Sequence, residues 1–290
     1  MLLYDKNVLL RRDWSMRRYG FALLLLVLLL LSSPCFAHFQ LIIPSKVFVE
    51  GSPEKVEFFM PFTHPMEGGP IMDVDKPVEF GFFFGGERKI LNDAVNVIEL
   101  GAFPSWHPEH AKHKDKKARA YKAQVLVDKP GDYIFYVIPQ PYFEAEEGRF
   151  IWQMAKVVVN AFGAEEGWDS PVGLEAEIIP LVKPYALWVG NEFKGKVMIG
   201  GKPASGVCVE VEYYNEDGKV KGLPSDAFIT QVVKTDENGV FSYVIPWAGW
   251  WGFSAIGEGG EREHQGKKYP VELDAVIWVK AFPLPEGVKR

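Results

Sequence analysis

The sequence predicts an all-β fold of two β-sandwich domains, the second of them immunoglobulin-like. Three observations lead to this prediction. The chain of 290 residues is longer than one average domain. It is rich in aromatic residues (9 Trp, 11 Tyr and 21 Phe) and in turn-forming residues (28 Gly and 21 Pro). Several short segments alternate between apolar and polar side chains with the period of a strand, as residues 121–127 do.

The first 37 residues have the pattern of an export signal. Several arginines precede an apolar run from residue 21 to residue 31, which is shorter than a membrane-spanning helix. Cys35 and Ala37 then place small residues three positions and one position before His38. We therefore expect cleavage after Ala37, so that residues 1–37 are a signal peptide and His38 begins the mature chain.

Export predicts a periplasmic or otherwise extracytoplasmic location. Three details stay open: translation can start at Met1 or at Met16, Cys35 can carry a lipid anchor, and the apolar run can remain as an uncleaved anchor. After cleavage only Cys208 remains, which excludes an intrachain disulfide. We expect no direct membrane span in the mature chain. The formal charge of −6 gives no support for a nucleic-acid partner.

The mature chain divides at a short connector stiffened by two prolines, at positions 180 and 184. Residues 38–180 are expected to form an N-terminal β domain that carries all the histidines except His264. Residues 185–282 are expected to form the immunoglobulin-like sandwich. Residues 283–290 are expected to be a tail.

Apolar alternation and turn residues predict the individual strands. Asn238-Gly239 is typical of a hairpin turn, because both residues tolerate a positive φ. The segment 104–117 has no strand pattern and is expected to be a long solvated loop, a kind of segment that is often functional. The expected strands cover residues 40–43, 56–60, 78–84, 96–100, 120–127, 133–138, 192–199, 207–213, 241–245, 252–256 and 275–280.

His38 is the first candidate metal ligand. A histidine at the start of a chain offers one metal ion two nitrogen donors, the free α-amine and an imidazole nitrogen. Such donors suit Cu(II), Ni(II) and Co(II) better than they suit hard, oxygen-seeking ions. This interpretation requires cleavage after Ala37; the alternative is that His38 merely follows the cut in a loose terminus.

His64 is the second candidate ligand, because it stands where a strand runs into a turn rich in Gly and Pro. Three methionines lie nearby in the sequence: Met60, Met66 and Met72. Their thioether sulfurs would favour Cu(I). Methionine also fills gaps in hydrophobic cores, and that interpretation stays open for all three.

His107, His110 and His113 form the third candidate group. Spaced by three, they would lie near one face if a helical turn formed there. Several lysines stand beside them, which is unfavourable for a cation site. Two interpretations therefore remain: a fourth ligand or a weak capture loop for metal, and a solvated polar loop.

The sequence contains no recognisable catalytic motif, so we predict that the protein is not an enzyme. It has no Gly-x-Ser-x-Gly nucleophile turn and no phosphate loop. Cys208 is expected in the middle of a strand, and His264 on a surface loop. The tryptophans at 247, 250 and 251 are interpreted as core residues; a sugar-binding platform is the alternative.

Several motifs resemble the periplasmic component associated with nickel and cobalt uptake transporters, a family also known as an exported domain of unknown function. The likeness covers nearly all of the mature chain. Its motifs are Ala37-His38, residues 63–68 (Thr-His-Pro-Met-Glu-Gly), residues 167–174 (Gly-Trp-Asp-Ser-Pro-Val-Gly-Leu), residues 177–181, residues 201–203, residues 235–241 and residues 248–252.

The resemblance implies a two-domain β protein that binds a divalent transition metal outside the membrane and delivers it to a membrane metal-uptake transporter. His38 and His64 occupy the family's histidine positions. Nickel or cobalt is the metal that the resemblance favours, and copper and zinc stay open. Two alternatives remain: an envelope binding module that recognises polysaccharide or protein without metal, and a copper oxidase that uses a histidine brace.

Overall fold

The computed structural model describes residues 38–288, so the predicted export signal and its cut site lie outside the described residues. Within this part of the chain the secondary structure consists of β-strands and two short 3-10 helices, with no α-helix. No helix found in residues 38–288 has the length and apolar character needed to cross a membrane. The all-β prediction is confirmed.

The strands vary from short bridging pieces to long ribbons. In chain order they are β1 (Phe39–Gln40), β2 (Ile43–Pro44), β3 (Phe48–Val49), β4 (Glu54–Met60), β5 (Phe62–Thr63), β6 (Glu79–Phe84), β7 (Glu87–Ile90), β8 (Val95–Gly101), β9 (Lys117–Val127), β10 (Gly131–Ile138), β11 (Tyr142–Glu144), β12 (Arg149–Ala161), β13 (Ala176–Pro180), β14 (Leu187–Trp188), β15 (Glu192–Ile199), β16 (Lys202–Pro203), β17 (Cys208–Tyr213), β18 (Gln231–Lys234), β19 (Val240–Val244), β20 (Gly249–His264) and β21 (Lys267–Phe282). The 3-10 helices are η1 (Asn92–Ala94) and η2 (Asp226–Phe228).

The N-terminal half forms a sandwich of two sheets. One sheet has the order β2-β4-β9-β8, and it faces strands β12, β10, β6 and β7 of a larger sheet. Along β4 the buried residues alternate with exposed ones, so Phe58 points inward. Its ring centroid lies 4.1 Å from that of Phe135 on β10 and 5.7 Å from that of Phe80 on β6. These contacts between aromatic rings form the core of the first sandwich.

The C-terminal half forms a second sandwich. Strands β13, β15, β16 and β19 make one sheet, and β14, β17, β18, β20 and β21 belong to the other. Phe193 of β15 packs on Phe253 of β20 with a centroid distance of 4.5 Å. Val209 and Val211 of β17 are fully buried, and Glu210 and Glu212 on the opposite face of the strand are buried as well.

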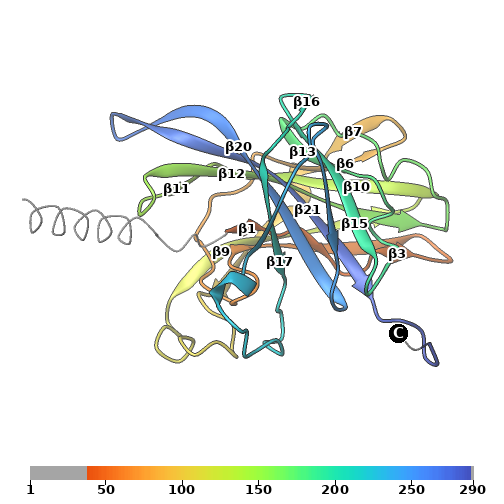
Figure 1. Ribbon diagram of the computed structural model, residues 1–290, viewed down its shortest axis with the longest axis horizontal. Helices are drawn as coiled ribbons and strands as arrows, with labels where there is room; N and C mark the ends of the chain where they lie inside the picture. Colours follow the sequence, from red (N-terminus) through yellow and green to blue (C-terminus); the bar gives the residue numbers. More distant parts are fainter. Residues whose placement is uncertain (1–37, 289–290) are drawn as a thin grey trace, which may run out of the picture. The chain divides into compact units, whose positions relative to one another are not determined.

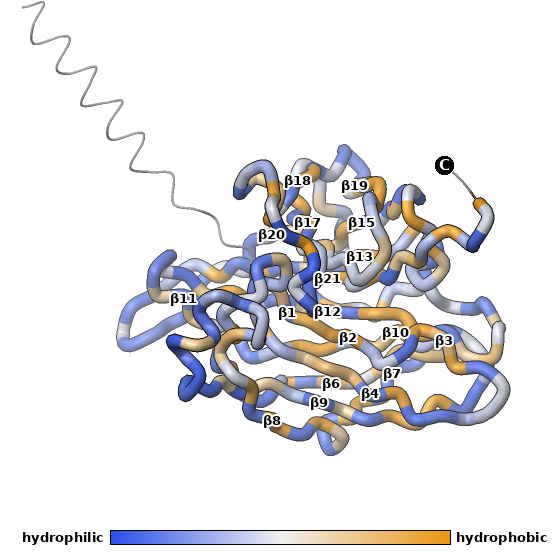
Figure 2. The backbone as a smooth tube through the Cα atoms, turned by 90° about the horizontal axis from the view of Figure 1, so that it is seen from below, coloured by the Kyte–Doolittle hydropathy of each residue, from blue (hydrophilic) through white to orange (hydrophobic). Residues whose placement is uncertain are grey.

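The two sandwiches share a sheet. Strand β12 pairs in parallel with β21, in register from Phe150 opposite Val271 to Val157 opposite Trp278. The sheet thus continues as β18-β17-β20-β21-β12-β10-β6-β7 through both halves (Figure 1). Hydrophobic residues run along β4, β10 and β12, where the layers meet (Figure 2). The division of the chain at residues 180–184 stays a prediction.

Several local expectations were wrong. Turn 236–239 forms, with Gly239 at φ +77, but it connects β18 to a strand of the other sheet and is not a hairpin. The strand expected at 40–43 is divided into β1 and β2, which pair with different strands. Strand β12 was not anticipated, because thirteen consecutive residues that are mostly buried show no alternation.

Candidate metal centre

The pairing of β1 with β5 places the two main candidate ligands opposite each other. Phe39 pairs with Thr63 and Gln40 pairs with Phe62, in antiparallel register. Continuing that register by one residue brings His38 opposite His64. Side chains directly opposite each other in an antiparallel pair lie on the same face and touch.

The rings of His38 and His64 meet in a buried position. Their centroids are 4.2 Å apart with an interplanar angle of 48°, and each residue is only 6% exposed. Phe62 and Tyr142 form aromatic walls, at 5.4 Å and 6.1 Å from the His38 ring. Two imidazoles within one ring's width of each other can reach a single metal ion.

A carboxylate lies beside the His38 ring. Glu144 Oε2 is 3.5 Å from His38 Nε2, and both side chains are largely shielded from solvent. Glu144 ends β11, whose pairing with the start of β12 brings it to this position. A carboxylate next to one imidazole nitrogen favours a proton on that nitrogen, and the other nitrogen then keeps its lone pair for a metal.

The main chain of the histidine strand is held by one buried amide. Gln153 Oε1 accepts the Gln40 N–H at 2.8 Å, while Gln153 Nε2 donates to the His38 carbonyl oxygen at 2.6 Å and to Asp274 Oδ2 at 3.0 Å. Trp278 Nε1 donates to the Gln40 carbonyl oxygen at 2.9 Å. The amide therefore acts like a neighbouring strand, because it satisfies the backbone groups of β1 that would otherwise be buried without partners.

Asp274 lies behind this amide in a fully buried position. Burial raises the pKa of its carboxyl group well above the usual range, and the nearby Glu272 carboxylate adds to this effect. A neutral carboxyl group explains how Asp274 can be placed in the core without a cationic partner.

The turn after His64 is held by the C-terminal sandwich. Glu212 Oε2 accepts the Met66 N–H at 3.2 Å, and Asn215 Nδ2 donates to the Met66 carbonyl oxygen at 3.2 Å. The Asn215 N–H also donates to the Pro65 carbonyl oxygen at 3.1 Å. Burial raises the pKa of Glu212 well above its usual value. Residues of β17 and of the segment after it thus fix the turn that carries one candidate ligand.

The other three candidate histidines gather around Phe103. The rings of His107 and His113 stack near Phe103, with centroid distances of 4.7 Å and 5.6 Å, and His110 Nδ1 lies 2.9 Å from the Phe103 carbonyl oxygen. His113 Nε2 is 3.5 Å from Glu109 Oε2. Burial lowers the pKa of His107. Each of these histidines is engaged within its own segment, whereas His38 and His64 contact each other.

Residues 104–116 form a run of turns that Trp106 docks against the rest of the protein. The indole Nε1 donates to the Glu216 carbonyl oxygen at 2.9 Å. A Cβ atom added to Gly68 or Gly218 would lie 2.2 Å or 2.4 Å from the Trp106 ring, so the indole packs directly on both glycines. The segment between β8 and β9 has no strand, as the sequence predicts, and Trp106 anchors this loop to the segment that follows β17.

The remaining candidate residues have structural surroundings. Met60 and Met66 are buried, and the Tyr142 hydroxyl donates to Met72 Sδ at 3.7 Å. His264 ends β20 and stacks on Phe143 at 4.2 Å, so it is not in a loop. Cys208 begins β17 and does not lie in the middle of it. Trp250 and Trp251 are buried, as expected for core residues.

No group of three or more His, Cys, Asp or Glu side chains within residues 38–288 is arranged to hold a metal ion. A centre at His38 and His64 therefore needs a third donor of another kind. Sequence reasoning did not identify Gln153 or Glu144, because a single glutamine in an apolar strand and a glutamate in an acidic segment give no signal of proximity to residue 38.

Glu177, in one of the motifs on which the family resemblance rests, has a clear structural role. Glu177 Oε2 lies 2.9 Å from Lys156 Nζ, and both side chains are buried. Glu177 also accepts the N–H groups of Val172 and Gly173 at 3.0 Å and 2.9 Å. Burial lowers the pKa of Lys156, and the charge of Glu177 opposes that effect. Glu177 therefore ties β13 to β12 and to the loop before β13.

Several solved structures are similar to this chain at low sequence identity. The D0-D1 domain of intimin is 15% identical to this chain. The match covers 85% of this chain and 100% of the intimin structure, with a TM-score of 0.21. The major pilin subunit BcpA of Bacillus cereus is 13% identical to this chain. The match covers 86% of this chain and 68% of the pilin chain, with a TM-score of 0.18. A marsupial T cell receptor is 9% identical to this chain. The match covers 87% of this chain and 76% of the receptor chain, with a TM-score of 0.20.

No curated protein matches the sequence. One family model does match, and it covers residues 35–259, which is most of the chain and includes both candidate histidines. The chain belongs to the family described as a domain of unknown function, DUF4198.

Proposed function

We propose that the mature protein binds one divalent transition-metal ion between His38 and His64 and delivers it to a membrane metal-uptake transporter. The observation that carries this proposal is the buried 4.2 Å contact between the two imidazole rings. The third donor is the α-amine of His38, which becomes available when the chain is cut after Ala37.

The surroundings of His38 favour this donor set. With Glu144 beside Nε2, the nitrogen available to a metal is Nδ1, which is also the ring nitrogen closer to the main chain. An amine and an Nδ1 of the same residue close a chelate ring on one ion. His64 adds a second imidazole from the opposite strand. The hydrogen bonds of Gln153 hold the main chain in place, so less conformational entropy is lost when the ion binds.

The choice of metal follows from the donors and from the resemblance. Three nitrogen donors suit Ni(II), Co(II), Cu(II) and Zn(II), and affinity alone rises from cobalt through nickel to copper. The resemblance to components of nickel and cobalt uptake favours those two ions as the physiological cargo. Selectivity over copper then depends on which ion the compartment supplies, because the donor type does not provide it.

The test is a calorimetric titration of protein that begins at His38 with Ni(II), Co(II), Cu(II) and Zn(II). We expect one site per chain, and a loss of affinity of at least about 100-fold in H38A and in H64A, since a lost ligand costs more than a lost outer contact. H264A is the matched control, because His264 is also packed against an aromatic ring but on the Phe143 side. Equal affinity in H38A, H64A and the unaltered protein would refute the proposal.

Delivery to a transporter is tested separately. Cells in which only H38A or H64A replaces the natural protein should accumulate less nickel or cobalt at limiting supply than cells with H264A. The unaltered protein can bind metal while cells with H38A or H64A still accumulate as much nickel or cobalt as cells with H264A. In that case the protein binds metal for another purpose.

A further inference from the structure

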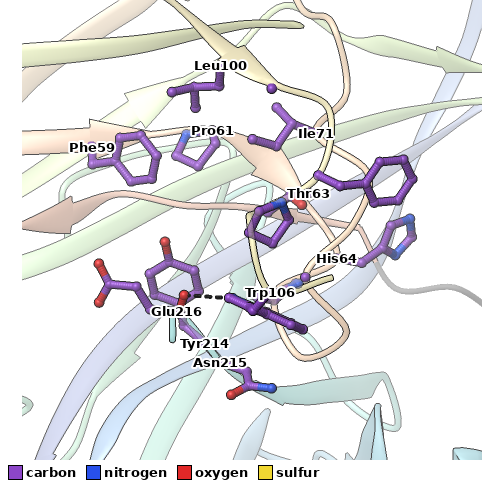
Figure 3. A pocket seen from close by; sticks show the side chains of 15 residues that line it. Phe59, Pro61, Thr63, His64, Ile71, Leu100, Trp106, Tyr214, Asn215 and Glu216 are labelled. Atoms are coloured by element: carbon purple, nitrogen blue, oxygen red, sulfur yellow. Dashed lines mark hydrogen bonds between the residues drawn. The ribbon is translucent and has the colours of Figure 1, made fainter. Parts of the chain in front are cut away.

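A cavity of about 230 Å³ lies beside the turn that carries His64. Its walls come from β4, β5, β8, the segment before His107 and the start of the segment after β17. The side chains that define it are Phe59, Pro61, Ile71, Leu100, Trp106 and Tyr214 (Figure 3). The lining is therefore almost entirely apolar and aromatic.

The size of the cavity suits one small ring system. A cavity of about 150 Å³ lined by apolar side chains is large enough to stay dry and to bind benzene. The cavity in this protein is larger than that, and it falls short of the 300 Å³ or more of typical drug-sized pockets. The volume points to a phenyl- or indole-sized ligand.

The polar groups of the cavity set the chemistry of the ligand. The Tyr214 hydroxyl points into the cavity (Figure 3). Burial raises the pKa of Tyr214, so the hydroxyl remains protonated and can donate a hydrogen bond. Glu216 is the one acidic residue among those that line the cavity, and the lining has no lysine or arginine, which disfavours an anionic ligand.

The cavity and the histidine pair share a wall. The main chain of His64 lines the cavity, while its ring points away from it (Figure 3) and toward His38. Trp106 closes another side, held by the Glu216 carbonyl oxygen and packed on Gly68. The Gly68 N–H donates to the His64 carbonyl oxygen at 2.9 Å. A molecule in the cavity therefore contacts the residues that fix the position of His64.

We propose that this cavity binds a small neutral aromatic molecule with one hydrogen-bond acceptor, which Tyr214 recognises. Filling the cavity restrains Trp106 and the turn from His64 to Gly69, so the ligand and the metal ion bind cooperatively. Only this cooperativity rests on the proposed metal function. Binding of the aromatic molecule does not depend on it.

The binding test uses metal-free protein and three probes of nearly equal size. Acetophenone has a phenyl ring and a carbonyl acceptor, α-methylstyrene has the same shape without the acceptor, and benzoate carries a negative charge. Chemical shifts of the protein are followed by NMR as each probe is added. We expect acetophenone to bind with a Kd below about 1 mM and more tightly than either of the other probes.

Three variants locate the binding. L100W fills the cavity and should weaken acetophenone binding at least tenfold. V97W is the matched control on the same strand, because Val97 is 59% exposed and lies on the opposite face of β8 from Leu100. Y214F should weaken acetophenone binding about fivefold and leave α-methylstyrene unchanged. No saturable binding, or the same loss in L100W and V97W, would overturn the proposed site.

The cooperativity is measured by repeating the metal titration with saturating acetophenone. We expect the metal affinity to rise at least fivefold, and the acetophenone affinity to rise by the same factor when metal is bound. An unchanged metal affinity would overturn the cooperativity. If the protein binds no metal at all, the proposed function fails, while the titration of metal-free protein still decides whether the aromatic site exists.

Discussion

The side-chain amide of Gln153 hydrogen-bonds to the carbonyl oxygen of His38 at 2.6 Å, across 115 positions of sequence. The same amide accepts the N–H of Gln40, so two main-chain groups of the histidine strand are fixed by one buried side chain. His38 is therefore held as firmly as a core residue although the mature chain is expected to begin there. This contact would make His38 a preorganised ligand of the proposed metal centre.

Replacing Gln153 should weaken both folding and metal binding. Q153L leaves the His38 carbonyl and the Gln40 N–H buried without this partner, and we expect a loss of about 2–3 kcal/mol in the free energy of unfolding. Metal affinity should fall about 10- to 100-fold, as it does when a supporting contact of a ligand is removed. Urea unfolding and calorimetry measure the two effects. Q124L, at an exposed position of β9, should change neither.

Asp274 should make the protein less stable as the pH rises. Burial raises the pKa of its carboxyl group, so the folded protein keeps a proton that the unfolded chain releases above about pH 4. Stability is then greatest below that pH and decreases toward the raised pKa, by up to about 1.4 kcal/mol per pH unit. D274N imitates the neutral carboxyl group and should make this slope smaller between pH 5 and pH 7; the buried Glu212, whose pKa is also raised, accounts for the part that remains. Urea unfolding across that range measures it; D93N, at an exposed site, should retain the slope of the unaltered protein.

Gly218 should be essential for docking of Trp106. G218A and G222A carry the same backbone cost, because both glycines have a positive φ, +64 and +67. Only at Gly218 would the new methyl group meet the indole, and Gly222 has nothing within 4 Å. We expect G218A alone to shift the tryptophan emission to longer wavelength and to speed tryptic cleavage in segment 104–117. Equal behaviour of the two variants would contradict the docked arrangement.

The buried pair Lys156–Glu177 should contribute far more to folding than a surface pair. E177A leaves the Lys156 ammonium buried without its carboxylate and removes the acceptor of two main-chain N–H groups. We expect a loss of about 3–5 kcal/mol in the free energy of unfolding. E54A breaks the exposed pair with Lys46 and should cost at most about 1 kcal/mol. A loss below 1 kcal/mol in E177A would show that the pair is not required.

Much of the fold follows from local sequence patterns. The alternation along β4 and β9 predicts both strands and their inward faces correctly. Alternation also predicts β17 as a strand, but the residues on both of its faces are buried. The shared sheet does not follow from any local pattern. The parallel pairing of β12 with β21 joins residues more than a hundred positions apart. A uniformly apolar strand indicates that it is buried, but it does not indicate which strand it pairs with.

The histidine pair could be proposed from the sequence because each member stands at a recognisable position, one beside the cut site and one in a Gly/Pro turn. The side chains that support these two histidines could not be predicted from the sequence. Glu144 reaches His38 only because β11 folds back on β12, and Gln153 reaches it only because β12 crosses beneath β1. The grouping of His107, His110 and His113 around Phe103 likewise depends on the docking of Trp106, which needs glycines from two distant turns.

The most direct test of the metal centre compares two proteins that differ by one residue. The first begins at His38, and the second carries one alanine before it, which converts the α-amine into an amide and leaves both imidazoles unchanged. Calorimetric titration with Ni(II) and Cu(II) should show that the added residue lowers the affinity at least about 100-fold, while urea unfolding of the metal-free proteins remains the same. Equal affinity for metal in the two proteins would contradict a centre built on the free amine of His38.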